Sequence, residues 1–229
     1  MTSPARELLA GVRVAPSILS ADFGSLREQV AEVLAAGARV IHVDVMDGHF
    51  VPPITVGPLV VAGLAEQVRE AQAMLDVHLM IARPERHVAE FVKAGADSVT
   101  FHAEATPHAS YAAGLIREAG ACVGVAVNPA TPVGELAELT AELDLALCMT
   151  VNPGWGGQRF IERQVDKVRR VRALVGDDVE IEVDGGIDAQ TAPRCAEAGA
   201  TLFVAGSAVF GADDPAAAYS AIAEAAGAA

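Results

Sequence analysis

Side chains that suit metal binding and proton transfer recur on one face of two otherwise apolar segments. In residues 40–46, His42, Asp44 and Met46 alternate with three aliphatic residues. Successive side chains of a β-strand point to opposite faces, so these three share a face. Residues 74–80 repeat the pattern, with His78 and Met80 in alternating positions. A polar face is costly inside a core unless something binds its polar groups, so both segments are candidates for a functional site.

A third segment supplies another carboxylate, because residues 181–183 read as a strand that ends on Asp184. The ligand candidates are then two imidazoles and two carboxylates, without a thiolate: His42, Asp44, His78 and Asp184. This set suits Zn²⁺, Fe²⁺, Co²⁺ or Mn²⁺ and does not choose among them. The alternative is that each residue is a buried polar group satisfied by ordinary hydrogen bonds.

The same two carboxylates suit acid–base catalysis. Asp44 and Asp184 belong to the second and seventh of the expected strands, so in a closed barrel they can face each other across its mouth. One could then remove a proton from one face of a carbon while the other returns a proton to the opposite face. The alternative is that both carboxylates are metal ligands only.

The elements that must position these residues follow from the hydrophobic periodicity. Four Ala-Gly-Ala tripeptides, centred on Gly37, Gly95, Gly120 and Gly199, each end a helix-period stretch and precede an apolar run. Gly there is typical of a helix C-terminus that turns directly into a strand. Eight strands are expected, at 12–16, 40–46, 74–80, 98–102, 122–127, 145–150, 180–184 and 202–206. Amphipathic stretches between them predict helices, among them 23–36, 84–94, 158–175 and 189–198, and the tail after Pro215 predicts a final helix.

Eight βα units in 229 residues predict a (β/α)₈ TIM barrel that forms a single α/β domain over residues 1–229. The alternative is an open, doubly wound sheet. In a barrel, the active site lies where the strands end and the βα loops begin. The candidate ligands, Met46 and Met80 lie near such strand ends, at alternating positions that all face the barrel interior.

Three glycine-rich turns follow the last three expected strands. They are residues 152–158, which contain Gly154, Trp155, Gly156 and Gly157, then Gly185 and Gly186 after Asp184, and finally Gly206 and Ser207. Glycine lets backbone N–H groups approach an anion, and barrels commonly bind phosphate after strands seven and eight. The alternative is that these are only turns. We expect a phosphate cradle assisted by helix N-terminal dipoles.

Other residues near the predicted mouth allow two interpretations each. Met46, Met80 and Met149 are either core filler or an apolar lid over a planar intermediate. Ser17, after the first strand, either donates a hydrogen bond to the substrate or stabilises a turn. His102 ends the fourth strand, where a structural role is the expectation.

Composition excludes several classes of function. The net charge of −14 disfavours nucleic acid and anionic membranes as partners, and no apolar run approaches the length of a membrane span. The two lysines, Lys93 and Lys167, fall in helical patterns, which argues against a Schiff-base aldolase. Three widely spaced cysteines and the absence of a signal-peptide layout in residues 1–14 predict free thiols and a cytoplasmic location.

Taken together, these motifs closely resemble the ribulose-phosphate 3-epimerase family. The resemblance covers residues 15–23, 42–52, 76–80, 128–132, 151–158, 183–187 and 204–210, and so extends over most of the chain. The usual family residues are replaced at Pro53, Val56, Thr150 and Trp155, none of which is a proposed ligand.

The resemblance implies a TIM barrel that interconverts D-ribulose 5-phosphate and D-xylulose 5-phosphate in the pentose phosphate pathway. It implies that Asp44 and Asp184 are the acid–base pair and that His42, Asp44, His78 and Asp184 bind one divalent metal ion per chain. Zn²⁺ or Fe²⁺ is the first expectation for that ion, with Co²⁺ or Mn²⁺ as alternatives. Ser17, His78 and the glycine turns are expected to contact substrate under a cap of Met46, Met80 and Met149. A homo-oligomer is also expected.

Two other functions fit the same motifs. One is a 3-epimerase acting on allulose 6-phosphate, a substrate with one more carbon. The other is a non-catalytic sugar-phosphate-binding barrel, although binding alone needs no opposed carboxylates.

Overall fold

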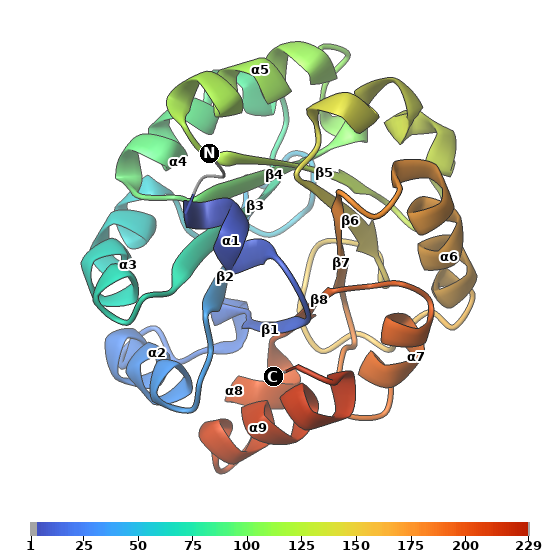
Figure 1. The fold of residues 1–229 in the computed structure, drawn as a ribbon. Helices are drawn as coiled ribbons and strands as arrows, with labels where there is room; N and C mark the ends of the chain where they lie inside the picture. The colour runs from blue at the N-terminus through green and yellow to red at the C-terminus, as the bar shows by residue number, and fades with distance from the viewer. Residues whose placement is uncertain (1–3, 229) are drawn as a thin grey trace.

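The computed structural model describes residues 4–228 and shows eight parallel strands arranged as a ring, with helices outside it (Figure 1). The strands are β1 (Arg13–Pro16), β2 (Val40–Met46), β3 (Met74–Met80), β4 (Ser98–His102), β5 (Cys122–Val127), β6 (Leu145–Met149), β7 (Glu180–Asp184) and β8 (Leu202–Ala205). The chain is thus a single (β/α)₈ TIM barrel, and the expected fold class is confirmed. The ends of the 1–229 range, residues 1–3 and 229, lie outside the described part.

Strand pairing brings the candidate ligands to one height in the barrel. β2 and β3 pair so that Asp44 is opposite His78, and β6 and β7 pair so that Met149 is opposite Asp184. β1 pairs with β8, and a parallel bridge between Ser17 and His42 joins β1 to β2. The ring therefore closes directly beside a candidate ligand.

Helices surround the sheet because the outward face of its strands is apolar. β2 to β6 consist entirely of buried residues, as expected of parallel strands covered on the outside and packed on the inside. The outer α-helices are α2 (Leu26–Ala35), α3 (Pro58–Glu70), α4 (Val88–Ala94), α5 (Ala109–Ala119), α6 (Gln164–Val175), α7 (Ala192–Glu197), α8 (Ser207–Phe210) and α9 (Pro215–Ala226). Four 3₁₀ segments complete the layer: η1 (Ile18–Ser20), η2 (Pro84–Arg86), η3 (Ala103–Ala105) and η4 (Val133–Glu142).

The expected strands agree with the observed ones to within one residue at each end, whereas some helices begin later than predicted. α6 begins at Gln164 rather than at 158, because the Gln158 amide donates to the carbonyls of Asn152 and Trp155 and closes a loop. α2 begins at Leu26, after a turn in which Asp22 accepts a hydrogen bond from the N–H of Gly24. In both cases side-chain-to-backbone bonding competes with the helix.

The prediction for the Ala-Gly-Ala tripeptides is confirmed. Their glycines, Gly37, Gly95, Gly120 and Gly199, have φ values of 111°, 115°, 94° and 102°. These angles favour glycine, and they let each helix stop and enter the next strand within two or three residues.

An N-terminal helix that the periodicity did not reveal closes one end of the barrel. α1 (Pro4–Leu9) lies across the opening of the ring in Figure 1. Leu9 is fully buried in a cluster with the first residues of five strands: Val40, Met74, Cys122, Leu145 and Leu202. These are N-terminal strand ends, so α1 seals the end of the barrel opposite the candidate site.

Two further sequence expectations have structural counterparts. Cys122, Cys148 and Cys195 are all free and buried. Within residues 4–228, no helix combines the length and the apolar character needed to cross a membrane.

Candidate active site

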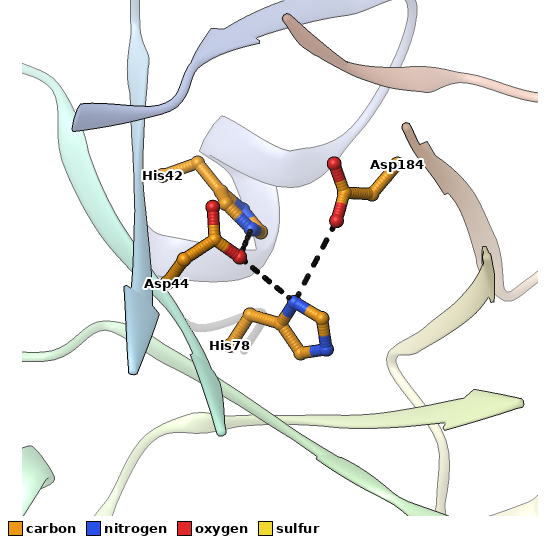
Figure 2. A group of neighbouring side chains, drawn as sticks. All are labelled: His42, Asp44, His78 and Asp184. Carbon is orange, nitrogen blue, oxygen red and sulfur yellow. Dashed lines mark hydrogen bonds and ion pairs between the residues drawn. The ribbon is translucent and has the colours of Figure 1, made fainter. Parts of the chain in front are cut away.

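The four predicted ligands converge at the C-terminal end of the barrel (Figure 2). One potential ligand atom from each of His42, Asp44, His78 and Asp184 lies within 4.8 Å of the others. Asp44 Oδ1 is 3.3 Å from His42 Nε2 and 3.1 Å from His78 Nδ1, and Asp184 Oδ2 is 3.8 Å from the same His78 nitrogen. In Figure 2, Asp44 and Asp184 lie on opposite sides of this group.

The orientation of His42 suits a metal ligand. Its Nδ1 lies 2.7 Å from Asp76 Oδ2 and donates a hydrogen bond to it, which leaves Nε2 with a free lone pair. That Nε2 is buried and has no hydrogen-bond partner among the described residues. Carboxylate-backed imidazoles are the usual arrangement of metal-binding histidines. The donor set therefore fits a divalent cation.

Asp76 and Glu182 form a second acidic layer below the cluster. Glu182 Oε1 is 3.3 Å from His42 Nδ1, and both acidic side chains are fully buried. Burial and the negative charge of Asp76 raise the pKa of Glu182 well above its ordinary value. Asp76 lies two residues before His78, and Glu182 lies two residues before Asp184, so each shares a strand face with a candidate ligand. This alternation was already visible in the sequence.

His78 has a partner that sequence reasoning did not assign to the site. Its Nε2 lies 2.8 Å from Nε2 of His102, and the two rings stack with centroids 4.9 Å apart. His102 is fully buried at the end of β4. A structural role was expected for His102, but the structure places it in direct contact with a candidate metal ligand.

The two opposed carboxyl groups have different pKa values. Burial would raise the pKa of Asp44, but the nearby His42 imidazole and the charge and hydrogen bond of His78 outweigh burial and hold that pKa below its ordinary value. Burial and the negative charge of Asp44 together raise the pKa of Asp184 to about 7. A pair of carboxyl groups whose environments separate their pKa values in this way is typical of acid–base catalysis.

The pKa values of the two histidines in the cluster are also shifted by burial and by the surrounding carboxylates. Burial lowers the pKa of His78 to about 4, so its imidazole is neutral, as a metal ligand must be. Burial would also lower the pKa of His42, but the charges of Asp44 and Glu182 outweigh it and raise that pKa well above 6.5. A field that attracts a proton to His42 equally attracts a metal cation.

The cluster opens into a cavity at the mouth of the barrel. Among its lining are Ser17, Met46, Met80, Met149, Gly154, Trp155, Gly156, Gly157, Asp184, Gly185, Gly186, Gly206 and Ser207. All of these were predicted to contact substrate. Asp44 also lines the cavity, whereas the fully buried ring of His78 is not part of the lining.

Close packing restricts two glycines of this lining in particular. A Cβ atom on Gly186 would lie 2.7 Å from the backbone nitrogen of Phe160, and one on Gly206 would lie 2.8 Å from Ser20 Oγ. Ser20 also lies within 3.3 Å of the position of a Cβ on Gly156. Its hydroxyl thus sits between two glycine loops, and sequence reasoning did not single it out.

The expected assistance from helix dipoles is small. Of the helices that follow the three glycine turns, only α8 begins directly at the cavity, and it has four residues. α6 and α7 begin at Gln164 and Ala192, several residues beyond the turns. Individual backbone N–H groups must therefore do most of any anion binding here.

Ser17 combines both roles that the sequence left open. Its hydroxyl donates to Asp44 Oδ2 at 2.5 Å and accepts a hydrogen bond from the N–H of Leu19 at the start of η1. The hydroxyl thereby orients a catalytic candidate while it stabilises the turn. Met46 and Met80 pack with Val51 in a small apolar cluster at the mouth, consistent with either a lid or core filler.

Neither lysine is available for covalent catalysis. Lys167 lies on α6, is 2% exposed, and donates to the backbone carbonyls of Asn128 and Thr131. Lys93 is in the last turn of α4. The sequence-based exclusion of a Schiff-base aldolase is thus consistent with the structure.

Comparison with known proteins agrees with the geometry. The model of the ribulose-phosphate 3-epimerase family matches residues 13–210. The chain belongs to the ribulose-phosphate 3-epimerase family. Ribulose-phosphate 3-epimerase from Bacillus subtilis is 51% identical over 208 residues, which cover 89% of this chain and 94% of that protein. The epimerase from Escherichia coli K12 is 48% identical over 200 residues, covering 86% of this chain and 88% of the relative.

Solved structures outside the epimerase family share the barrel. Streptococcus mutans KGPDC superposes with a TM-score of 0.74 at 17% identity, covering 96% of this chain and 98% of that one. At this level of identity the likeness concerns the fold alone.

Proposed function

We propose that this protein interconverts D-ribulose 5-phosphate and D-xylulose 5-phosphate by proton transfer at carbon 3. The observation that carries the proposal is the convergence of Asp44 and Asp184 from opposite sides of the barrel on one cavity. One carboxylate removes the proton from one face of the carbon, and the other carboxyl group delivers a proton to the opposite face. The intermediate between these steps is a planar enediolate, which fits under the methionine side chains at the mouth.

We further propose that His42, Asp44, His78 and Asp184 hold one divalent metal ion. Zn²⁺ and Fe²⁺ are the first candidates, with Co²⁺ and Mn²⁺ as alternatives, because the set combines imidazoles with carboxylates. When bound, such an ion supplies Lewis acidity that offsets negative charge on the substrate oxygens. Ser17 keeps the Asp44 carboxylate oriented, and the hydrogen bond to Asp76 keeps His42 Nε2 directed at the cluster.

The glycine loops are the proposed phosphate site. With a net charge of −14 and no lysine at the mouth, a dianionic phosphate depends on local backbone N–H donors. Gly157, Gly186, Gly206 and Ser207 all line the cavity, and Ser20 adds a hydroxyl close to Gly206. This arrangement supports a sugar phosphate as the substrate class.

Solvent-isotope exchange tests the catalytic proposal. In D₂O, the D-xylulose 5-phosphate that the purified protein forms from D-ribulose 5-phosphate should carry one deuterium at carbon 3, because the proton delivered to the opposite face comes from solvent. Proton NMR of the sugar phosphates measures both events. A protein that binds the substrate but neither exchanges nor epimerises it would be a binding barrel, and faster turnover of D-allulose 6-phosphate would indicate the six-carbon substrate.

Metal content should follow the four-residue cluster. The purified protein should hold about one divalent ion per chain, as one tetrahedral-type ligand set predicts. His42→Ala and His78→Ala should leave the protein with well under one equivalent after the same dialysis, measured by elemental analysis. His87→Ala, at a half-exposed histidine outside the cluster, is the matched control and should retain the ion. Fully active, metal-free wild-type protein would contradict this prediction.

The three free, buried thiols support the expected cytoplasmic location, because a reducing compartment keeps cysteines unpaired. Self-association of the chain stays a prediction.

A further inference from the structure

We infer that His102 and Glu104 are positioning residues that fix the tautomer of His78, so that its Nδ1 lone pair faces the metal cluster. The inference rests on the metal site proposed above and extends it to residues that do not touch the ion. A line of polar contacts runs from Glu104 through His102 to His78 and ends at the two aspartates.

The contacts in this line are close. Glu104 Oε2 lies 3.4 Å from His102 Nδ1, and that nitrogen is buried and makes no hydrogen bond among the described residues. His102 Nε2 lies 2.8 Å from His78 Nε2. His78 Nδ1, on the other side of the ring, lies 3.1 Å from Asp44 Oδ1. Both imidazoles are fully buried, so water does not compete for these nitrogens.

Only one proton can lie between the two Nε2 atoms, so the two histidines have two alternative arrangements. In the first, His102 carries its proton on Nδ1, and its Nε2 accepts a hydrogen bond from the Nε2–H of His78. The Nδ1 of His78 is then a free metal ligand. In the second, every proton is on the opposite nitrogen, and His78 Nδ1–H blocks the metal position.

The charge of Glu104 selects the first arrangement. Burial would raise the pKa of this carboxyl group, but the nearby His102 and the hydrogen bonds of the neighbouring loop outweigh burial and lower the pKa to about 2. Glu104 is therefore a carboxylate, and a carboxylate only accepts hydrogen bonds. This charge favours a proton on the nitrogen facing it, His102 Nδ1. Asp44 faces His78 Nδ1 at 3.1 Å and by itself favours a proton there. A cation bound by Asp44 and His78 needs the Nδ1 lone pair, and Glu104 stabilises the arrangement that supplies it.

Glu104 is itself held in place by the loop after β5. Its Oε1 accepts hydrogen bonds from the N–H of Asn128, at 2.8 Å, and from the hydroxyl of Thr131. Lys167 binds the carbonyls of both loop residues from behind. The other carboxylate oxygen, Oε2, is left to face His102. Because the two oxygens have different partners, the charge of Glu104 can be removed while the hydrogen bonds to Asn128 and Thr131 are kept.

Glu104→Gln is the decisive variant. The amide oxygen can take the position of Oε1 and keep the bonds to Asn128 and Thr131, which places the NH₂ group opposite His102 Nδ1. That nitrogen must then accept, and the second arrangement follows. We expect the Zn²⁺ affinity, measured by competition with a chromophoric chelator, to fall about 10- to 100-fold, the usual effect of losing a carboxylate behind a ligating histidine.

Two control variants separate the proposed role from its alternatives. Glu90→Gln makes the same change beside the exposed His87, 3.7 Å from it, and should bind Zn²⁺ like wild type. Thr131→Val removes a loop anchor but keeps the carboxylate, so it should also bind normally. Wild-type affinity in Glu104→Gln, or an equal loss in Thr131→Val, would overturn the inference. A wild-type protein that binds no metal would instead refute the proposed metal site.

A measurement on the wild-type protein covers the case in which Glu104→Gln fails to fold. Long-range ¹H–¹⁵N spectra of the Zn²⁺-loaded protein distinguish the two neutral tautomers of each histidine. We expect His102 to carry its proton on Nδ1 and His78 to carry its proton on Nε2. A proton on Nε2 of His102 would overturn the inference.

Discussion

Asp44→Asn and Asp184→Asn should each lower the turnover number by about two to four orders of magnitude, the usual contribution of a general acid or base. Each substitution preserves the shape of the side chain but removes its ability to exchange a proton. Steady-state epimerisation of D-ribulose 5-phosphate, coupled to an assay for D-xylulose 5-phosphate, measures the loss. Because both residues also belong to the metal cluster, the metal content of each variant must be measured in the same preparation.

The matched control for both aspartates is Asp166→Asn, on the exposed face of α6, where the carboxylate pairs with Arg170. It makes the same chemical change and should leave turnover unaltered. A two-carboxylate mechanism also predicts that a single variant exchanges the substrate proton with solvent for one epimer at most. Near-normal epimerisation by either variant with its metal bound would exclude the mechanism.

Removing the phosphate from the substrate should reduce kcat/KM by about 10²- to 10⁴-fold. Hydrogen bonds to a charged group contribute about 1.5–3 kcal/mol each, and the estimate assumes the loss of two of them. Binding energy at the phosphate also positions the reacting carbon, so kcat should fall together with affinity. The comparison is D-ribulose against D-ribulose 5-phosphate with the same enzyme. A ratio near unity would mean that the glycine loops are only turns.

Gly206→Val tests the proposed phosphate site by changing the protein instead of the substrate. The new Cβ would lie 2.8 Å from Ser20 Oγ and 3.5 Å from Ser17 Cβ, so the side chain enters the phosphate end of the cavity. We expect a strongly raised KM with unchanged metal content. Gly63→Val is the control, because a Cβ at Gly63 on α3 meets nothing within 4 Å.

The strands and the four candidate ligands could be predicted from sequence for one physical reason. Alternating side chains on a buried strand must face either the helices or the barrel interior, so a polar residue between aliphatic ones identifies the inward face. His42, Asp44 and His78 follow this rule, Asp184 ends its strand with the same parity, and parallel pairing then aligns the strand ends. The glycine turns were equally visible because only glycine avoids the clashes found at Gly186 and Gly206.

Other features depend on contacts between distant segments, which no local pattern encodes. The interaction of His102 with His78 arises because β3 and β4 are neighbours and both rings point inward. Ser20 reaches the phosphate end only because β1 pairs with β8. α1 has only six residues, which is too short a segment to show a helical repeat in the sequence. Its role becomes clear only from the strand ends that it covers. The late start of α6 reflects hydrogen bonds made by the Gln158 side chain within its loop.

The distribution of the site along the chain bears on how such a barrel can be divided or recombined. Three of the four candidate ligands, His42, Asp44 and His78, come from the half that contains β1 to β4. Asp184 and the glycine loops come from the half that contains β5 to β8. Neither half-barrel is a functional module, and joining two copies of one half would duplicate either the imidazoles or the phosphate loops without completing a site. A bound sugar phosphate bridges the two halves, so the substrate itself becomes a cross-link between them.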